Sequence, residues 1–264
     1  MTSAAPRFAA NLSMLWQEAD PYDRFRLAAE AGFSRVEMLF PHQLDVDRVE
    51  ALLRELRLEM VLFDPAPGDW AGGERGLLCL PGREGEFLAT LRDAIALAGR
   101  LGTRKLNALA GILPAGVSRA DGERPAIANL RAAAPLVEAA GITLLVEAIN
   151  SIDMPGYFAD TIERAADLVM AAGSPFVRLQ LDQYHVAMMG DDPITALHRH
   201  DGLVRHVQIA DLPGRHEPGT GAYPIRGFLD ELGAIDYDGV VGLEYRPLGS
   251  TADSLAWLPL EARR

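Results

Sequence analysis

The chain has 264 residues and a formal net charge of −12, a surplus that repels phosphate backbones and argues against nucleic acid as a partner. No apolar stretch approaches the roughly 20 residues of a membrane span, and residues 1–7 lack an apolar signal core. The single cysteine, Cys79, excludes an intrachain disulfide and a thiolate zinc cage. We therefore expect a cytoplasmic protein with one domain over residues 1–264 and no membrane contact.

Short apolar or β-branched runs alternate with longer amphipathic segments along the whole chain. Continuous apolar runs are typical of parallel strands that are buried on both faces. The eight strand candidates, in chain order, are Phe8–Ser13, Arg35–Phe40, Met60–Asp64, Lys105–Ala110, Thr143–Ile149, Val177–Asp182, Val204–Ala210 and Val240–Glu244.

Helical patterns lie between these runs, and several of them end at a glycine, a residue that often follows the last turn of a helix. Gly32, Gly102, Gly141 and Gly173 are the clearest examples. Eight strands alternating with about eight helices is the count of a (β/α)₈ barrel. A doubly wound sheet would usually show fewer strands and a glycine-rich phosphate motif, which this chain lacks. We predict an α/β fold with a single (β/α)₈ TIM barrel.

One segment does not fit this alternation. Residues Asp64 to Arg83 form a long stretch rich in Gly and Pro after the third strand candidate, and it contains Trp70. A connection of that length is usually functional or disordered. It is interpreted either as a lid over the mouth of the barrel or as a long connection.

Polar residues at the carboxyl ends of barrel strands are informative because TIM-barrel active sites are built there. The last four strand candidates carry Glu147, Asp182, Gln208 and Glu244 at or near their carboxyl ends. Buried carboxylates that converge repel one another unless a cation or a proton lies between them. We therefore predict a metal site with these four residues as ligands. Oxygen ligands of this kind suit Mg²⁺ or Mn²⁺. Whether the activity requires the metal is left open.

The alternative interpretation is that these strand-end residues pair with Arg or Lys across the barrel. Arg215, in the loop after the seventh strand candidate, is the candidate for holding a substrate carboxylate, and His185 is a second substrate-binding candidate. His206 lies two residues before Gln208 and is expected deeper in the barrel, in a supporting or core role. His198 and His200 are expected on the exterior.

Two glutamates on opposite sides of a bound hydroxycarbonyl can move a proton between neighbouring carbons. Glu147 and Glu244 are therefore the predicted catalytic pair for an aldose–ketose type isomerisation. Which of them takes the first proton is left open. No G-x-S-x-G turn or activated cysteine suggests covalent catalysis.

At these positions the sequence resembles the hydroxypyruvate isomerases and the closely related 2-oxo-tetronate isomerases, within the xylose-isomerase-like barrels. The similarity extends over nearly the whole chain. The resemblance implies conversion of hydroxypyruvate to 2-hydroxy-3-oxopropanoate, with Glu147 and Glu244 as the paired acid and base and with Asp182 and Gln208 at the other metal positions. The motifs that carry it include Ala66 to Trp70, Leu80 to Glu84, Asp153 to Phe158, Val207 to Asp211, Arg215 to Gly221 and Glu244 to Pro247.

The chain also departs from the family pattern near the predicted mouth. Ile152 replaces an arginine and Ala222 a glutamate, while Asn107 and Asp64 stand where a histidine and an asparagine are common. The proton-shift residues are retained, so we predict an isomerase of a small hydroxy-oxo acid. Hydroxypyruvate is the first candidate substrate, and a 2-oxo-tetronate isomerase or another ketose isomerase or epimerase is the alternative.

Two alternatives come from other classes of protein. A phosphodiesterase of the endonuclease type would need a histidine-rich multi-zinc cluster and a basic groove, and neither is visible in the sequence. A non-catalytic barrel that binds a sugar acid would bind without exchanging substrate protons. Homo-oligomerisation is left open, because no surface patch in the sequence specifies a symmetry.

Overall fold

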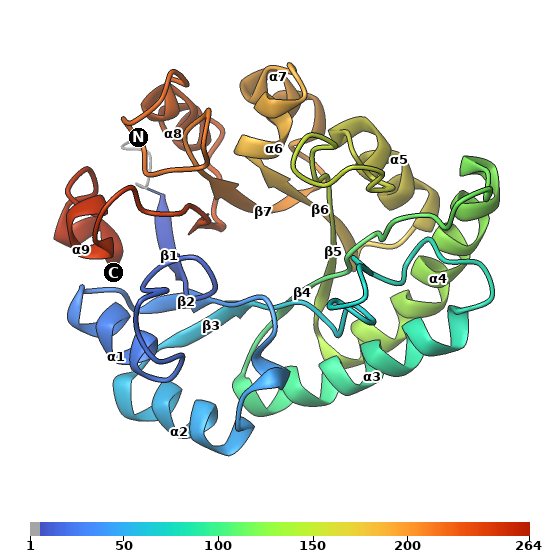
Figure 1. Ribbon diagram of the computed structural model, residues 1–264, viewed down its shortest axis with the longest axis horizontal. Coiled ribbons are helices and arrows are strands. Elements are labelled where there is room, and N and C mark those ends of the chain that lie inside the picture. Colours follow the sequence, from blue (N-terminus) through green and yellow to red (C-terminus); the bar gives the residue numbers. More distant parts are fainter. Residues whose placement is uncertain (1–5) are drawn as a thin grey trace.

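The computed structural model describes residues 6–264 and shows one eight-stranded parallel sheet surrounded by helices (Figure 1). The strand order is β3-β2-β1-β8-β7-β6-β5-β4, and a bridge between Phe63 and Leu106 joins the two outermost strands. The sheet therefore forms a nearly closed barrel, and the predicted (β/α)₈ TIM barrel is confirmed. The strands are β1 (Arg7–Asn11), β2 (Arg35–Glu37), β3 (Glu59–Leu62), β4 (Lys105–Asn107), β5 (Thr143–Glu147), β6 (Val177–Asp182), β7 (Val204–Ile209) and β8 (Val240–Leu243).

The helices form an outer ring around the barrel (Figure 1). Gly102, Gly141 and Gly173 follow α3, α4 and α5 with φ of 73°, 65° and 69°, the left-handed conformation that glycine adopts without steric cost. The helices are α1 (Asp23–Glu30), α2 (Val46–Leu56), α3 (Glu84–Leu101), α4 (Arg119–Ala140), α5 (Ile162–Ala172), α6 (Gln183–Met188), α7 (Pro193–His200), α8 (Ile225–Ala234) and α9 (Thr251–Ser254), with 3₁₀ turns η1 (Pro41–Gln43) and η2 (Leu260–Arg263).

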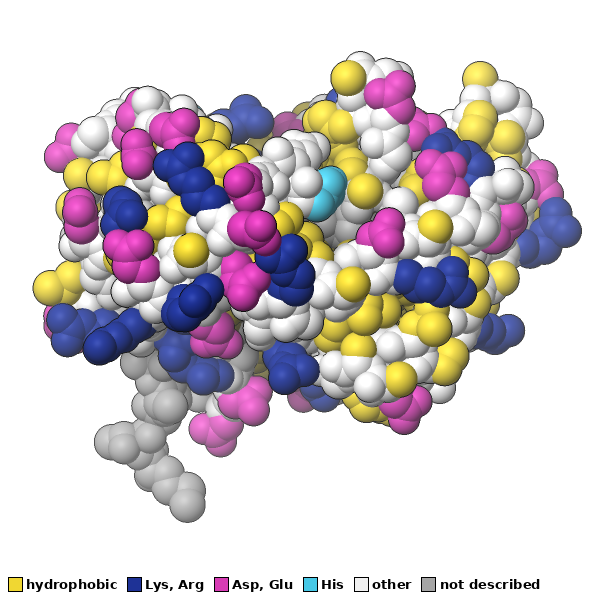
Figure 2. Space-filling view, turned by 90° about the horizontal axis from the view of Figure 1, so that it is seen from below, with side chains coloured by type: hydrophobic (Ala, Val, Ile, Leu, Met, Phe, Trp, Pro, Cys, Tyr) yellow, Lys and Arg dark blue, Asp and Glu magenta, His cyan; other side chains and the backbone are white. Residues whose placement is uncertain are grey.

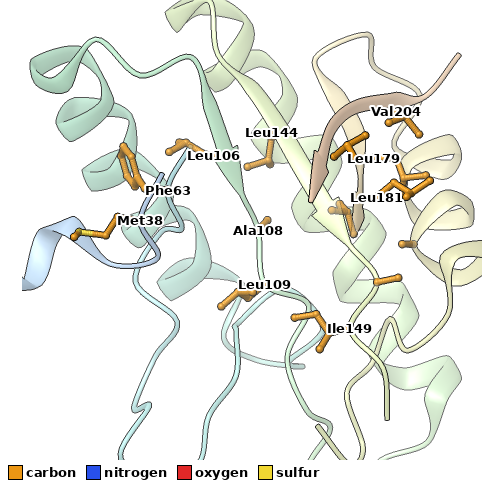
Figure 3. Close-up of a cluster of buried hydrophobic side chains, with 14 of the residues drawn as sticks. Met38, Phe63, Leu106, Ala108, Leu109, Leu144, Ile149, Leu179, Leu181 and Val204 are labelled. Atoms are coloured by element: carbon orange, nitrogen blue, oxygen red, sulfur yellow. The ribbon is translucent and has the colours of Figure 1, made fainter. Parts of the chain in front are cut away.

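The main hydrophobic core lies between the strands and the helices. Leu106, Leu144, Leu179 and Val204 come from four successive strands, β4 to β7, and lie in one buried cluster (Figure 3). A second, smaller cluster holds Ala9, Val61, Leu62, Leu145 and Val240. This smaller cluster lies inside the barrel. Residues two positions apart on a strand point to the same face, so a residue two positions after a member of this cluster also points into the barrel. Asn11 and Glu147 are such residues, and they reach the carboxyl end of the barrel.

The predicted strands are all present, but most of them are shorter at their carboxyl ends than predicted. The third strand, predicted to reach Asp64, ends at Leu62, and the fourth, predicted to reach Ala110, ends at Asn107. Asp64 and Leu109, which lie beyond these ends, line a cavity. A run of apolar residues does not reveal where pairing with the neighbouring strand stops.

The surface carries both kinds of charge. On the face shown in Figure 2, acidic and basic side chains alternate, and hydrophobic atoms lie between them. Within residues 6–264, no helix combines the length and the apolar composition needed to cross a membrane.

Candidate active site

A cavity of about 290 Å³ opens at the carboxyl ends of the strands, and residues in or just after all eight strands line it. This is the end of a TIM barrel at which active sites are found. The volume is at the small end of the range for ligand pockets. The cavity therefore suits a small molecule.

Three of the four predicted metal ligands lie in this cavity wall, and the fourth lies directly behind it. Glu147 ends β5, Asp182 ends β6, Gln208 lies in β7 and Glu244 directly follows β8; all four are buried. Ligand atoms of Glu147, Asp182 and His185 lie within 4.8 Å of one another. The structure thus brings the strand-end carboxylates together, as expected from the barrel.

Arg215 forms ion pairs with two of these carboxylates. Its Nη2 atom lies 3.2 Å from Asp182 Oδ2 and 3.1 Å from Glu244 Oε2, and all three side chains are largely buried. Arg215 also lines the cavity, where it can reach a bound anion. The pairing with a basic residue, which was the alternative interpretation, is therefore present, and two of the three paired residues, Arg215 and Glu244, line the cavity.

The loop that carries Arg215 is held by a buried carboxylate that the sequence analysis quoted only within a motif. Asp211 accepts hydrogen bonds from the backbone N–H groups of Gly219 at 2.8 Å and Gly221 at 2.9 Å, and also from Leu212 and Tyr223. A Cβ at Gly221 would lie 2.1 Å from the Leu212 carbonyl oxygen, so this position requires glycine. These contacts give Arg215 a defined position.

Burial and mutual repulsion disfavour the charged forms of the carboxylates. Burial raises the pKa of Glu147 well above its usual range, and the charges of Glu244 and Asp182 raise it further. Burial also raises the pKa of Glu244 to about 8, although Arg215 works in the opposite direction. One guanidinium does not compensate for the whole group, so a proton or a further cation is favoured at this site.

The residues present fit a divalent cation. Glu244 Oε2 meets no donor in hydrogen-bond geometry within the described part of the chain, and Glu147 and Asp182 supply further buried oxygens. Gln208 adds a neutral amide to this set. Such a donor set, rich in oxygen and without thiolates, is the kind that Mg²⁺ and Mn²⁺ prefer.

His185 is placed to donate a hydrogen bond rather than to act as a metal ligand. Its Nδ1 atom accepts from the backbone N–H of Asn150 at 3.3 Å, so the ring proton belongs on Nε2, which lies 3.4 Å from Asp182 Oδ2. Burial, with a contribution from Arg215, lowers the pKa of His185 well below its usual value. The neutral ring lines the cavity, consistent with the predicted contact to substrate.

Two of the positions where the chain departs from the family pattern also reach the cavity. Asn107 Nδ2 donates to Glu147 Oε2 at 2.8 Å, which orients one of the predicted catalytic glutamates. Asp64 lies beside Asn107, and burial raises its pKa well above the usual range, while contact with Asn107 lowers it. Ile152, in contrast, is 61% exposed and is not among the residues that line the cavity.

Sequence reasoning missed a buried polar network beneath these residues. Glu37 accepts from Gln208 Nε2 at 2.7 Å, from Asn11 Nδ2 at 3.0 Å and from His206 Nε2 at 2.8 Å, and Gln180 donates to Gln208 Oε1 at 2.6 Å. His206 lies deeper than Gln208, as expected. Glu37 and Gln180 could have been found from the alternation along their strands, because Gln180 precedes Asp182 by two positions.

Of the two histidines expected on the exterior, one lies there and the other does not. His198 is half exposed and pairs with Glu231 at 2.9 Å, as an exterior residue should. His200 was expected on the exterior but is only 9% exposed, because it lies on the buried side of the last turn of α7. Neither lines the cavity.

The glycine-rich segment after β3 contributes to the mouth of the cavity. Trp70 packs against Phe40 with ring centroids 5.1 Å apart, and the Arg75 guanidinium lies 4.1 Å from the centre of the Trp70 ring. Both Trp70 and Arg75 line the cavity, whereas Leu77 to Leu80 are buried in the core. The segment therefore covers part of the mouth and is anchored beyond it. Its opening and closing as a lid stays a prediction.

Comparison with known proteins identifies relatives over nearly the full chain. The family model of the xylose isomerase-like TIM barrel matches residues 25–260. The chain is 40% identical to a 2-oxo-tetronate isomerase from Cupriavidus necator, with 96% of this chain and 97% of the relative aligned. It is 39% identical to a hydroxypyruvate isomerase from Escherichia coli, with 96% and 98% aligned.

Solved structures agree with this assignment. A crystal structure described as an AP endonuclease of family 2 from Brucella melitensis matches with a TM-score of 0.93 and 44% identity, over 96% of this chain and 97% of that one. A 3-keto-D-glucoside 4-epimerase from E. coli, at 21% identity and a TM-score of 0.78 over 97% and 99%, shares the fold. The chain belongs to the xylose isomerase-like TIM barrel family, among the relatives named hydroxypyruvate isomerase and 2-oxo-tetronate isomerase, and is an enzyme of the isomerase class.

Proposed function

We propose that the protein interconverts hydroxypyruvate and 2-hydroxy-3-oxopropanoate by a proton shift between two glutamates. The observation that carries the proposal is the small buried cavity in which Glu147, Asp182 and Glu244 converge with Arg215. The names of the relatives support a hydroxy-oxo acid or a ketose as the substrate.

The proton shift requires one glutamate as base and the other as acid. One carboxylate removes a proton from C3 of hydroxypyruvate, which gives an enediolate. The other carboxyl delivers a proton to C2, and the hydroxyl proton passes from O3 to O2, so that the atoms balance without an oxidant. The raised pKa values of Glu147 and Glu244 suit this role, because a carboxyl whose pKa is raised holds a proton more readily and can pass it on to the substrate.

Other residues of the cavity position the substrate. Arg215 offers a guanidinium to the substrate carboxylate, and a substrate oxygen shares the single N–H of His185, on Nε2 at 3.4 Å from Asp182 Oδ2. Asn107 holds Glu147 by its 2.8 Å hydrogen bond. Trp70 and Arg75 cover part of the mouth and limit access of water to the enediolate.

A divalent metal is part of the proposal. Glu147, Asp182, Gln208 and Glu244 would hold Mg²⁺ or Mn²⁺. When bound, the ion acts as a Lewis acid that stabilises negative charge on the substrate oxygens. Arg215, through its ion pairs with Asp182 and Glu244, and the ion would then together balance the negative charge of the carboxylates.

The alternative substrate is a 2-oxo-tetronate or another small ketose. The near-equal identities to relatives of both names keep it in view. A cavity of about 290 Å³ holds a three-carbon or a four-carbon acid, so a comparison of turnover on the two acids separates these substrates. The endonuclease alternative is not favoured, because the one group of potential metal-binding residues found in residues 6–264 contains a single histidine, whereas such an enzyme needs a histidine-rich multi-zinc cluster.

Proton NMR in D₂O tests the proposal. Purified protein is mixed with hydroxypyruvate, with and without Mg²⁺ or Mn²⁺, and the same is done with Glu147→Gln and Glu244→Gln. Conversion to the aldehyde with deuterium incorporation, lost in both variants, is the expected result. Unchanged hydroxypyruvate under every condition would refute the named substrate, and a panel of longer sugar acids would then identify the alternative. Binding without deuterium exchange would indicate a non-catalytic barrel.

The remaining expectations belong to the same proposal. We propose a cytoplasmic enzyme with one domain over residues 1–264 and no nucleic-acid partner. Light scattering coupled to gel filtration measures whether it forms a homo-oligomer.

A further inference from the structure

A buried carboxylate beneath the cavity joins its own strand to side chains on two others. Glu37, the last residue of β2, is 1% exposed and receives hydrogen bonds from Asn11 of β1 and from His206 and Gln208 of β7. The two partners on β7 are 169 and 171 residues away in the sequence. The Asn11 and Gln208 amides each donate an N–H to Glu37 Oε1, and His206 Nε2 lies against Glu37 Oε2.

This carboxylate determines the orientation of the Gln208 amide. The atom of Gln208 that faces Glu37 at 2.7 Å must be the Nε2 donor, since its oxygen would meet another acceptor with no proton between them. The Oε1 atom of Gln208 then faces away from Glu37 and accepts from Gln180 Nε2 at 2.6 Å. Gln180 Oε1 has no hydrogen-bond partner among the described residues. Gln180 by itself therefore does not determine which way the two hydrogen-bonded amides point.

Glu37 fits inside the barrel because the neighbouring position on β8 is a glycine and has no side chain. A Cβ built on Gly242 of β8 would lie 2.3 Å from Glu37 Oε1 and 2.5 Å from Oε2. Gly242 is also the β8 residue in register with Gln208 of β7. The strand next to Gln208 thus accommodates the carboxylate that orients the Gln208 side chain.

We propose that Glu37 is a positioning residue that fixes the Gln208 amide so that only its oxygen is offered to a metal ion in the cavity. An amide oxygen has two lone pairs, and Gln180 uses one of them, so the second is available to a cation. An unconstrained amide could turn its NH₂ group toward the cation and repel it. This inference rests on the metal site of the proposed function and adds the residue that keeps a neutral ligand correctly oriented.

Metal binding measured without turnover tests the role of Glu37. Isothermal titration with Mn²⁺ is carried out on the wild type, on Glu37→Gln and on the surface control Glu55→Gln. The amide that the Glu37→Gln substitution introduces can accept or donate, so the Gln208 amide is free to turn. We expect Mn²⁺ affinity to fall by about 10- to 100-fold in Glu37→Gln, as is typical when a partner of a ligand is lost, and to be unchanged in Glu55→Gln.

A charge-swapped double variant separates positioning from stability. In Glu37→Gln with Gln208→Glu, the residue at position 208 ends in two oxygens, so its orientation no longer matters, and the number of carboxylates is unchanged. We expect the double variant to recover Mn²⁺ affinity to the wild-type level or above it. Recovery of folding without recovery of affinity would overturn the inference.

A measurement on the wild type needs neither a variant nor a metal. Gln208 Nε2 and Asn11 Nδ2 donate to the same oxygen of Glu37, so their NH₂ protons lie close enough for a nuclear Overhauser effect. We expect this cross-peak in metal-free protein. Its absence, or equal Mn²⁺ affinity in Glu37→Gln and the wild type, would refute the role of Glu37 alone. A wild type that binds no Mn²⁺ would instead refute the metal site of the proposed function and this role with it.

Discussion

Removal of the Arg215 guanidinium should destabilise the protein, because it would leave two buried carboxylates without their cation. The exposed fractions of the Arg215, Asp182 and Glu244 side chains are 17%, 0% and 10%. Breaking a buried pair by removing one partner costs about 3–5 kcal/mol when the other partner stays charged. The substitution Arg215→Met keeps the length and the apolar stem of the side chain and removes the charge.

The expected penalty depends on pH, because a carboxyl that takes up a proton escapes the unpaired charge. The pKa of Glu244 is already raised to about 8 and that of Asp182 is raised as well, and loss of the guanidinium raises both further. A raised native pKa means that stability is present at low pH and is lost as pH rises through the native value. The unfolding free energies of the wild type and Arg215→Met therefore diverge over the pH range in which the wild type has released a carboxyl proton that the variant still holds. The penalty should therefore be small near pH 5 and grow as pH rises above the native pKa of each carboxyl, by about 1.4 kcal/mol per pH unit for each carboxyl that the variant keeps protonated, up to the about 3–5 kcal/mol of an unpaired buried charge.

Urea unfolding in EDTA at pH 5.5, 7 and 8.5 measures this difference. The control is Arg199→Met, which removes an exposed arginine paired with Glu163 and should cost less than about 1 kcal/mol at every pH. Mg²⁺ at saturating concentration should return part of the lost stability to Arg215→Met, because it binds the native state only. Equal stability of Arg215→Met and Arg199→Met at pH 8.5 would refute the reasoning.

Three further predictions concern residues around the site. Asn107→Leu removes the hydrogen bond to Glu147 and should lower kcat on the order of 10- to 100-fold, the equivalent of about 1–3 kcal/mol. KM should stay nearly unchanged, and steady-state kinetics measures both constants. Asp211→Asn places an NH₂ group where four backbone N–H groups need acceptors, so hydrogen exchange in residues 212–223 should become faster and KM should rise. Burial lowers the pKa of Lys105, the only lysine, from 10.5 to about 8. The unfolded chain therefore binds more protons between pH 8 and 10.5, and Lys105→Met should stabilise the protein by about 3 kcal/mol at pH 7 and by less as pH rises through that window, measured by urea unfolding.

The fold was predictable because its signal is local. Each strand run and each helical stripe must bury its own apolar face, and glycines such as Gly102 and Gly141 end helices through their own backbone conformation. The carboxyl ends of the strands were less predictable. Asp64 was assigned to a strand that ends at Leu62, because the apolar run continues beyond the last paired residue.

The candidate site was predictable in part for a related reason. A parallel barrel places the carboxyl ends of all strands at one mouth, so the residue types at those ends indicated Glu147, Asp182, Gln208 and Glu244 before any distance was known. Asn107 was noted as a departure, but its contact with Glu147 depends on the register of neighbouring strands. That register is not written in either strand alone.

By itself the sequence determined the alternation of strands and helices, the barrel that follows from it and the kinds of side chain at its mouth. Only the tertiary structure decided which of those side chains meet. Arg215 pairs with Asp182 and Glu244, and Glu37 with residues about 170 positions away, because barrel closure brings distant strands to hydrogen-bond distance. Burial then shifts their pKa values through desolvation and mutual repulsion, and both effects depend on distances in three dimensions rather than on spacing along the chain.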